Sequence, residues 1–429
     1  MADELTQQAV PEKKRKISLA MLGPGLITGA SDDDPSGIAT YSQVGAQFGY
    51  GMSWIMLFSY PMMAATQEIS ARIGRVTGHG IAGNLRAHHS PWLLRAVVGL
   101  LLVANVINIG ADLGAMGDAI RLLIGGPATL YVVAIAFGCV WLEIFSRYGR
   151  YVSILKWLTL SLLAYVAVVL VVDVPWSHIA FHTFVPQIVM TKDYVVAIVA
   201  VLGTTISPYL FFWQASDEAE KERVTLGAHS LRRSPEQAPA EFRRIRLDTY
   251  IGMGLSNLIG YFIILTTAAT LNAQGVTDIQ TSAQAAEALR PIAGEFAFAV
   301  FALGIVGTGL LAVPVLAGSA AYAVGEALNW RTGLGRKPNR AKAFYAMIGV
   351  ATLGGVGIDF VHIDPIKALF WSAVINGVVA VPIMALMMRL ASAHKVMGRL
   401  TIPLSLRIMG WGSTAVMAVV VVAMLATWL

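Results

Sequence analysis

The sequence of 429 residues contains little charge and almost no cysteine. Asp, Glu, Lys and Arg together make up 13% of the residues, whereas an ordinary soluble protein has about 25%. Cys139 is the only cysteine, which excludes a disulfide framework and a cysteine-rich metal site. There is also no GxxxxGK[ST] phosphate loop, zinc-ligand spacing or ordered Ser/His/Asp set. We therefore expect neither an ATP-binding protein nor an enzyme, and no bound cofactor.

Hydrophobic residues dominate instead. They make up 56% of the chain, and the mean hydropathy is +0.66. No soluble fold of this size could bury so much apolar surface, so the sequence predicts an all-α polytopic membrane protein in contact with lipid. The formal net charge is +6, but the basic residues form short clusters between apolar stretches. Nucleic acid is therefore not an expected partner.

Eleven apolar stretches are long enough to cross a bilayer core of about 30 Å. The predicted spans cover residues 17–46, 51–74, 96–120, 126–146, 150–172, 194–216, 247–271, 293–328, 342–358, 365–390 and 406–428. A cleaved signal peptide over residues 1–31 is an alternative for the first span. The Gly23-Pro24-Gly25 interruption and the acidic run after it favour a broken spanning helix.

The distribution of Lys and Arg predicts the orientation of these spans. If residue 1 is cytoplasmic, 27 of the 31 Lys and Arg residues lie in cytoplasmic segments and only Arg121, Lys192, Arg290 and Lys367 lie outside. This bias follows the positive-inside rule. We therefore expect residues 1–16 to be a cytoplasmic tail and the C-terminus to lie outside, in a bacterial plasma membrane.

The first span is interrupted by Asp32-Asp33-Asp34-Pro35-Ser36-Gly37. Three carboxylates cannot sit in a lipid-facing helix, Pro35 removes a backbone donor, and Gly37 permits unusual backbone dihedrals. The pattern predicts two half-helices joined by an unwound segment whose carbonyl groups face a cavity.

The sixth span is interrupted in the same way, at Ser207-Pro208-Tyr209. Two interrupted helices, each opening a group of five spans, are typical of an inverted five-plus-five repeat with a binding site between the breaks. We expect the repeats to cover residues 17–172 and 194–390, and residues 406–428 to form an additional helix. The alternative is that each proline only kinks a packed helix.

Two further carboxylates lie within predicted spans. Asp112 is deep in the third span and is either hydrogen-bonded to a neighbouring helix or a proton-carrying group. Glu68 lies one turn from Arg72, so a local ion pair is favoured over a site. Asp118 and Arg121 are expected to pair in the same manner. Asparagines in the spans are expected to bond between helices; they are Asn105, Asn108, Asn257 and Asn376.

Several of these motifs resemble the Nramp family of proton-coupled divalent-metal transporters. Gly23-Pro24-Gly25 leading into Asp34–Thr40 is similar to the first-helix stretch that ends D-P-G-N-I-A-T, and Ala71–Gly78 is similar to A-R-L-G-x-V-T-G. Asp112-Leu113 resembles the start of D-L-A-E-x-x-G in helix three. The resemblance covers nearly the whole chain and implies the broken-helix transporter fold.

The resemblance also implies a set of metal ligands. Asp34 corresponds to the metal-binding aspartate, and the backbone carbonyls of Ser31 and Thr204 and the hydroxyl of Ser207 would complete the shell with water. Other ligand positions are changed. Gly37 stands where the family has an asparagine, and Ser207 and Tyr209 stand where it has the methionine and histidine of M-P-H. Ala373 aligns with a glutamine of the family, and Ala115 aligns with its helix-three glutamate.

These replacements leave oxygen donors and remove the thioether. Oxygen ligands favour hard cations, and Mg²⁺ binds through one or two carboxylates while keeping its waters. The resemblance is therefore greatest to Nramp-related magnesium carriers. Asp32 and Asp33 would add negative potential, although at least one is expected to point away because three like charges repel. Asp34, Asp112 and Glu68 remain as candidate proton carriers.

We therefore predict a monomeric secondary carrier that moves a divalent cation, Mg²⁺ or Mn²⁺, by alternating access, with proton coupling left open. Two alternatives remain. The same fold also carries organic solutes, and Tyr209 and the aromatic residues after it could contact one. The second alternative is a receptor or scaffold that retains the fold without transport.

Overall fold

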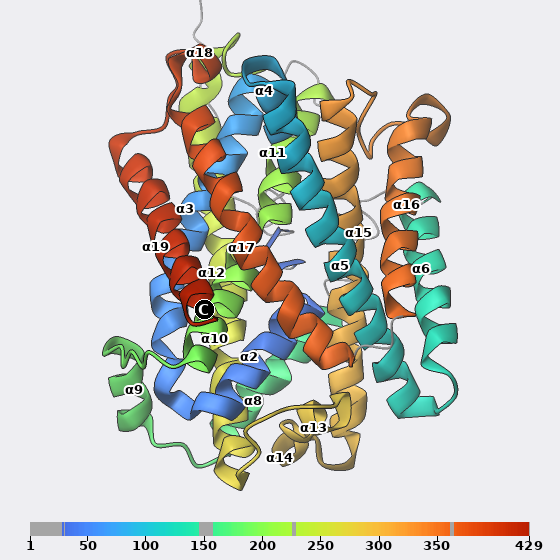
Figure 1. The fold of residues 1–429 in the computed structure, drawn as a ribbon, viewed down its shortest axis with the longest axis vertical. Coiled ribbons are helices and arrows are strands. Elements are labelled where there is room, and N and C mark those ends of the chain that lie inside the picture. Colours follow the sequence, from blue (N-terminus) through green and yellow to red (C-terminus); the bar gives the residue numbers. More distant parts are fainter. Residues whose placement is uncertain (1–27, 30, 146–157, 225–228, 361–363, 429) are drawn as a thin grey trace, which may run out of the picture.

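The computed structural model describes residues 28–29, 31–145, 158–224, 229–360 and 364–428. These residues form helices and connecting loops, with no strand among them. The long helices run side by side along the long axis of the molecule (Figure 1). They are α2 (Pro35–Phe48), α3 (Trp54–Thr77), α5 (Pro91–Ile124), α6 (Ala128–Phe145), α10 (Lys192–Thr205), α11 (Pro208–Val224), α12 (Ala238–Thr270), α15 (Ala297–Ala327), α16 (Lys342–Asp359), α17 (Pro365–Ser392) and α19 (Leu404–Ala426).

Shorter helices lie at the two ends of this bundle. Helices α4 and α18 are at one end and α9, α13 and α14 at the other (Figure 1). The shorter elements are α4 (Ile81–His88), α8 (Leu163–Val171), α9 (Trp176–Phe184), α13 (Ser282–Glu287), α14 (Arg290–Ala293), α18 (His394–Met397) and the 3₁₀ turns η2 (Gly49–Met52), η3 (Leu158–Leu162), η4 (Pro235–Gln237), η5 (Asn272–Gln274), η6 (Gly294–Phe296) and η7 (Pro338–Arg340).

The predicted all-helical fold is confirmed, but the count of eleven spans is not. Within the described residues, seven helices are long and apolar enough to cross a membrane, and an eighth is added if the bent pair formed by residues 160–171 and 176–184 is one span. Helices α3 and α16, which correspond to two predicted spans, do not meet that criterion. The predicted tail, residues 17–27 and 30 of the first span, and nearly all of the signal-peptide alternative over residues 1–31 lie outside the described residues.

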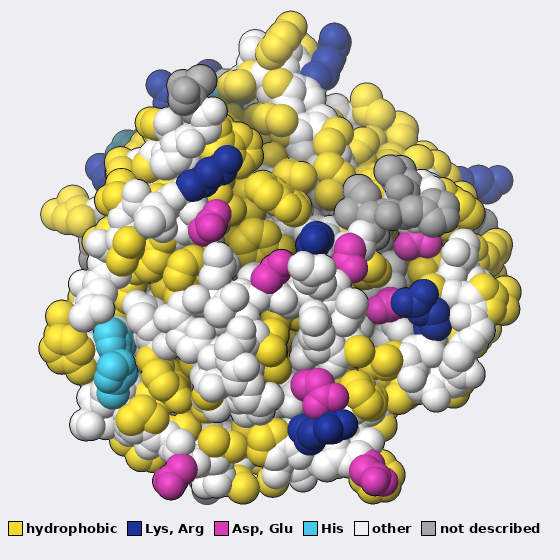
Figure 2. Space-filling view, turned by 60° about the horizontal axis from the view of Figure 1, so that its bottom comes forward, with side chains coloured by type: hydrophobic (Ala, Val, Ile, Leu, Met, Phe, Trp, Pro, Cys, Tyr) yellow, Lys and Arg dark blue, Asp and Glu magenta, His cyan; other side chains and the backbone are white. Residues whose placement is uncertain are grey.

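The surface of the bundle is apolar where lipid would contact it. Large hydrophobic side chains are exposed on α5, α6, α12 and α19; examples are Val103, Phe137, Leu255 and Val419. Figure 2 shows the α9 end of the molecule, where hydrophobic side chains are spread over much of the face and acidic and basic side chains are scattered among them. This distribution is the one that a membrane-embedded protein requires.

Both predicted helix interruptions are present. Residues 28–29 and 31–32 are helical, and α2 begins at Pro35 after a break at Asp33 and Asp34. In the second interruption, α10 ends at Thr205 and α11 begins at Pro208. Each α-helix that follows a break starts with proline, whose missing N–H and fixed φ suit the first helical position.

Small residues bring the broken helices close to their neighbours. A Cβ atom on Gly29 would overlap the backbone of Gly252 in α12, and one on Gly203 in α10 would overlap the carbonyl oxygen of Ala373 in α17. Helix α2 also packs on α12 and α17, and α11 packs on α3. The breaks are therefore enclosed by α3, α5, α12 and α17, which position the side chains described next.

Candidate functional site

Asp34 lies in the first break and is fixed by the helix that follows it. It is the N-cap residue of α2, and its Oδ1 accepts a hydrogen bond of 2.6 Å from the backbone N–H of Gly37. Its own carbonyl accepts from Ile38 N. The side chain is 2% exposed. Capping orients the carboxylate and leaves Oδ2 free to face the neighbouring helices.

Two other elements contact the second oxygen of Asp34. The side-chain amide of Asn108 in α5 donates to Oδ2 at 3.2 Å, and the hydroxyl of Tyr209 in α11 lies 3.4 Å from the same atom. That hydroxyl is also 3.1 Å from the carbonyl oxygen of Ser31. The two broken helices and α5 therefore converge on one small group of oxygen and amide donors.

Asp32 and Asp33 face a different helix. Their carboxylates are 2.7 and 3.0 Å from the hydroxyl of Ser256 in α12. Both are buried. Of the three consecutive carboxylates, only Asp34 contacts Asn108 and Tyr209, so the acidic run is divided between two sides of the break.

Asp112 lies one turn after Asn108 on α5 and is fully buried. Neither of its side-chain oxygens has a side-chain hydrogen-bond partner within the described part of the chain, and the carboxylate interacts electrostatically with Asp34. The carboxylate also interacts with the backbone N–H of Ser36, but it has no basic partner among the described residues. This is an unusual arrangement, because burying a charge without a compensating charge is costly.

The four carboxylates together make the centre of the bundle strongly acidic. None of the ion pairs found among the described residues includes Asp32, Asp33, Asp34 or Asp112. Buried charges are normally paired or coordinate a metal. Ionised carboxylates here would therefore need a compensating positive charge.

Ser207 and Thr204 lie at the second break, where their polar groups contact each other. The Ser207 hydroxyl donates to the carbonyl oxygens of Gly203 and Thr204, at 2.7 and 2.8 Å. It thereby satisfies two carbonyls at the end of α10 that lack helical partners. In this conformation, two of the four predicted ligands bind each other, and only a local rearrangement would turn them toward a cation.

Gly37 and Ala373 occupy places where larger side chains would meet neighbours. A Cβ atom on Gly37 would lie 3.2 Å from Oγ1 of Thr204 and 3.3 Å from the carbonyl oxygen of Asp32. Ala373 is buried at the crossing of α17 with α10. Neither position contributes a side-chain ligand. Gly37 leaves space between Thr204 and Asp32, whereas Ala373 allows the close crossing of α10 and α17.

Glu68 forms the local ion pair that the sequence favours. Its Oε1 is 2.6 Å from Nη2 of Arg72 and 3.4 Å from Nε of Arg246. The predicted pair between Asp118 and Arg121 is also present. Glu68 is thus neutralised by basic side chains, in contrast to Asp34 and Asp112.

Sequence reasoning missed the partner of Asn108 and the role of Ser256. Asn108 bonds between helices, as the sequence predicts, but its partner is Asp34 itself. Its position four residues before Asp112 places both polar groups on one face of α5, and this spacing was the available signal. Ser256 offered no comparable signal, because a single serine in an apolar span is common.

The donors around Asp34 determine what the site can bind. They are a carboxylate, a backbone carbonyl, a phenol and an amide, with neither sulfur nor imidazole among them. No group of three or more His, Cys, Asp or Glu suited to holding a metal occurs among the described residues. The arrangement fits a hard cation held by a few oxygens and water.

Two interrupted helices that enclose buried carboxylates inside an apolar bundle define the broken-helix class of membrane transporters. The chain belongs to the Nramp family, because residues 25–427 match the family model described as natural resistance-associated macrophage protein-like.

Named relatives and solved structures agree with this assignment. The divalent metal cation transporter MntH of Klebsiella pneumoniae (strain 342) is 27% identical over 316 residues, which cover 72% of this chain and 73% of that protein. The MntH of Yersinia enterocolitica is 28% identical over 308 residues, which cover 70% of this chain and 71% of that protein. The manganese transporter of Eremococcus coleocola, in complex with an aromatic bis-isothiourea compound, has a TM-score of 0.71 at 16% identity, covering 94% and 85% of the two chains.

A more distant fold neighbour carries a different ligand. MHP1, a nucleobase-cation-symport-1 family transporter with bromovinylhydantoin bound, has a TM-score of 0.51 at 12% identity, covering 95% of this chain and 92% of that one. At such identities the similarity concerns the fold alone. The choice of cargo depends on the side chains at the breaks.

Proposed function

We propose that this protein is a secondary carrier that moves a divalent metal cation across the membrane by alternating access. The observation that carries the proposal is the buried carboxylate of Asp34. It lies at the helix break with no basic partner among the described residues, within reach of Tyr209 and Asn108, and the Tyr209 hydroxyl also contacts the carbonyl of Ser31. A cation bound here would neutralise Asp34 and be released when the helices around the break move apart.

We propose Mg²⁺ or Mn²⁺ as the cargo. The all-oxygen environment favours hard cations, and the few protein ligands suit an ion that keeps part of its water shell. Manganese is supported by the names of the relatives, and magnesium by the absence of a thioether at Ser207. The ligand set has Asp34 and the Ser31 carbonyl at its centre, with Thr204 and Ser207 joining after the Ser207 hydroxyl leaves the end of α10.

We further propose the arrangement of the chain in the membrane. The cytoplasmic bias of Lys and Arg supports a cytoplasmic N-terminus and an external C-terminus, which places α4 on the cytoplasmic side and α9 outside. The helix breaks, one in each of residues 17–172 and 194–390, support an inverted repeat followed by α19.

Proton coupling, where it occurs, is assigned to Asp112. Glu68 is occupied by Arg72 and Arg246, whereas Asp112 has no basic partner among the described residues and lies one turn from Asn108. We expect Asp112→Asn to retain cation binding but to lose acceleration of uptake by an inward proton gradient. Uptake that responds to the gradient as in the wild type would exclude Asp112 from this role.

The test of the cargo is calorimetric titration of the purified protein with Mg²⁺, Mn²⁺ and Ca²⁺. Asp34→Asn preserves the size of the side chain and removes its charge, and it should abolish binding and uptake into dye-loaded vesicles. Asp118→Asn makes the same change at a carboxylate paired with Arg121 away from the break and should leave both unchanged. Saturable organic uptake with no ion flux would support the organic-solute alternative, and neither flux would support a scaffold.

A further inference from the structure

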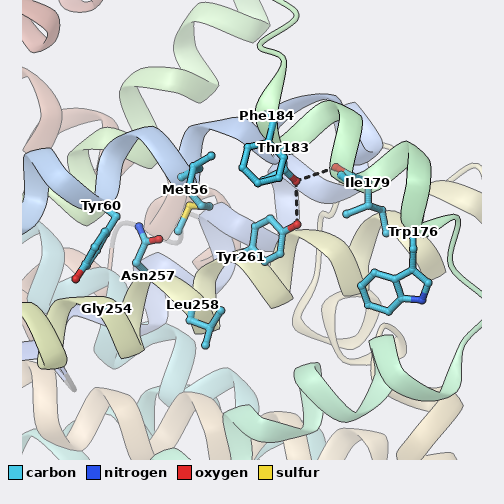
Figure 3. Close-up of a pocket in the computed structure, with 12 residues that line it drawn as sticks. Met56, Tyr60, Trp176, Ile179, Thr183, Phe184, Gly254, Asn257, Leu258 and Tyr261 are labelled. Carbon is cyan, nitrogen blue, oxygen red and sulfur yellow. Dashed lines mark hydrogen bonds between the residues drawn. The ribbon is translucent and has the colours of Figure 1, made fainter.

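A cavity of about 470 Å³ opens between α3, α9 and α12 (Figure 3). The α12 residues that contact the first broken helix, Gly252 and Ser256, do not line it. Its walls include Met56, Trp176 and Leu258. The polar groups in it already have partners: the hydroxyls of Thr183 and Tyr261 are 2.9 Å apart, and the amide of Asn257 donates to Ser59. The cavity therefore offers an apolar surface rather than unpaired polar atoms.

A second cavity of about 470 Å³ continues the first along α12. It shares Tyr60 and Gly254 with the first and extends to Arg246. We call the two together the α12 groove. From Arg246 to Tyr261 the helix advances about 22 Å at about 1.5 Å per residue, which is more than half of a bilayer core of about 30 Å. The groove is thus long enough for an acyl chain that crosses one membrane leaflet.

The Arg246 end of the groove carries an excess positive charge. The Arg246 side chain is 54% exposed, and its ion-pair partner Glu68 is shared with Arg72 at the shorter distance of 2.6 Å. Two guanidinium groups therefore face a single carboxylate. An anion approaching from the membrane surface would complete the charge balance, and a guanidinium binds phosphate oxygens in a two-point geometry.

We propose that the α12 groove binds an anionic glycerophospholipid from the leaflet on the Arg246 side, which is the cytoplasmic leaflet in the proposed orientation. Its phosphate pairs with Arg246, and one acyl chain lies along Tyr60 and Gly254 and ends in the cavity beside Leu258. A free phosphate would leave the apolar part of the groove empty, and a zwitterionic lipid would not supply the missing charge.

The position of the groove gives the lipid a structural consequence. Asn257, which borders the groove, directly follows Ser256, whose hydroxyl contacts Asp32 and Asp33. On the same helix, Gly252 abuts Gly29 ahead of the break. A chain seated in the groove supports α12 from the lipid side, opposite the face that holds the first interrupted helix.

The test compares the lipids that the full-length protein retains from an equal mixture of phosphatidylglycerol and phosphatidylcholine, measured by native mass spectrometry. The wild type should retain phosphatidylglycerol preferentially. Arg246→Gln should lower that preference about fivefold, the factor expected for one Lys or Arg contact near an anionic surface. Arg243→Gln, at an exposed position one turn earlier that borders neither cavity, should leave the preference unchanged.

A second pair of variants tests the acyl-chain part. A Cβ atom at Gly254 would make only ordinary contacts of 3.4 Å with Tyr60. The Gly254→Ala variant should therefore fold normally and retain lipid. The larger side chain of Gly254→Leu fills the groove, so this variant should retain neither phosphatidylglycerol nor phosphatidylcholine. Thermal melting of each variant establishes that it is folded. The proposal is overturned if Arg246→Gln behaves as Arg243→Gln does, or if folded Gly254→Leu retains lipid as Gly254→Ala does.

Discussion

At the scale of single residues, the carboxylates in or beside the spans that were singled out from the sequence differ in whether an arginine pairs with them. Glu68 and Asp118 have arginines beside them, and the ion pairs account for their presence. Asp34 and Asp112 lie near a helix break with no such partner in the described part of the chain. Composition alone does not separate these groups; the contacts do.

The Tyr209 side chain of the second broken helix contacts the first broken helix. It lies within hydrogen-bonding distance of the Ser31 carbonyl and Asp34. We expect Tyr209→Phe to fold normally and to bind Mg²⁺ or Mn²⁺ about fivefold more weakly, because one hydrogen bond contributes about 1 kcal/mol. Calorimetric titration measures this change.

Tyr131→Phe is the matched control for that variant. The Tyr131 hydroxyl donates to the carbonyl of Gly125 in an exposed loop, away from the break. It should bind cations as the wild type does. Equal affinities of the Tyr209 and Tyr131 variants would remove Tyr209 from the site.

The sequence predicted Asp34 at the break, the Glu68–Arg72 pair and the change of Ser207 from a soft to a hard donor. It could not predict that the Ser207 hydroxyl caps α10, because this contact depends on where α10 ends. Nor could it assign Asp32 and Asp33 to Ser256, since that contact joins residues more than 200 positions apart. Local chemistry is readable from sequence, whereas side-chain partners are set by tertiary packing.

At the scale of helices, proline determined the breaks and small residues determined the crossings. Pro35 and Pro208 mark the starts of α2 and α11, as the sequence predicted. The predicted number of spans was less secure, because neither α3 nor α16 reaches the hydropathy of a membrane-spanning helix; most residues of α3 are buried against protein, whereas α16 exposes Val350 and Leu353. Hydropathy detects contact with lipid; it is a weaker signal for helices enclosed by other helices.

The crossing of α10 and α17 is tight enough to exclude a methyl group. A Cβ atom on Gly203 would overlap the carbonyl oxygen of Ala373 and lie 2.5 Å from the backbone nitrogen of Gly377. We expect Gly203→Ala to lower the free energy of unfolding by about 1–3 kcal/mol, the usual cost of overpacking. Thermal or denaturant unfolding in detergent measures this loss.

Gly349→Ala separates overpacking from a general effect of alanine. Gly349 lies within α16, and a Cβ atom there would meet nothing within 4 Å. Because alanine favours helix over glycine by up to about 1 kcal/mol, this variant should be as stable as the wild type or more stable. Equal losses in both variants would contradict a tight α10–α17 crossing.

At the scale of the whole molecule, an ion-pair network joins three helices on the side proposed to be cytoplasmic. Arg244 of α12 binds Glu218 of α11 at 2.5 Å and Glu241 at 3.1 Å, and Glu241 also binds Arg75 of α3. Glu218 is fully buried. The network therefore ties the second half of the broken helix to its neighbours, and a carrier that alternates its access must break or move such contacts.

We expect Arg244→Gln to open this side of the molecule. Removing one partner of a buried ion pair costs about 3–5 kcal/mol because the other charge is left unpaired, and separation of α11 from α12 would give Glu218 access to water. A cysteine placed at Gln214, which is buried one turn before Glu218, should then react faster with a membrane-impermeant maleimide. Cys139 is the only native cysteine, so a Cys139→Ser background isolates this signal.

The control for the opening is Arg243→Gln in the same Gln214→Cys background, because Arg243 is exposed and makes none of the ion pairs of the described residues. Its labelling rate should match that of the parent. Retained Mg²⁺ or Mn²⁺ binding by the Arg244 variant would show that faster labelling reports opening rather than unfolding. Equal labelling rates of the two arginine variants would mean that the ion-pair network stabilises the fold without holding the cytoplasmic side closed. The contacts that block access from the cytoplasm to the site would then have to lie elsewhere in the bundle.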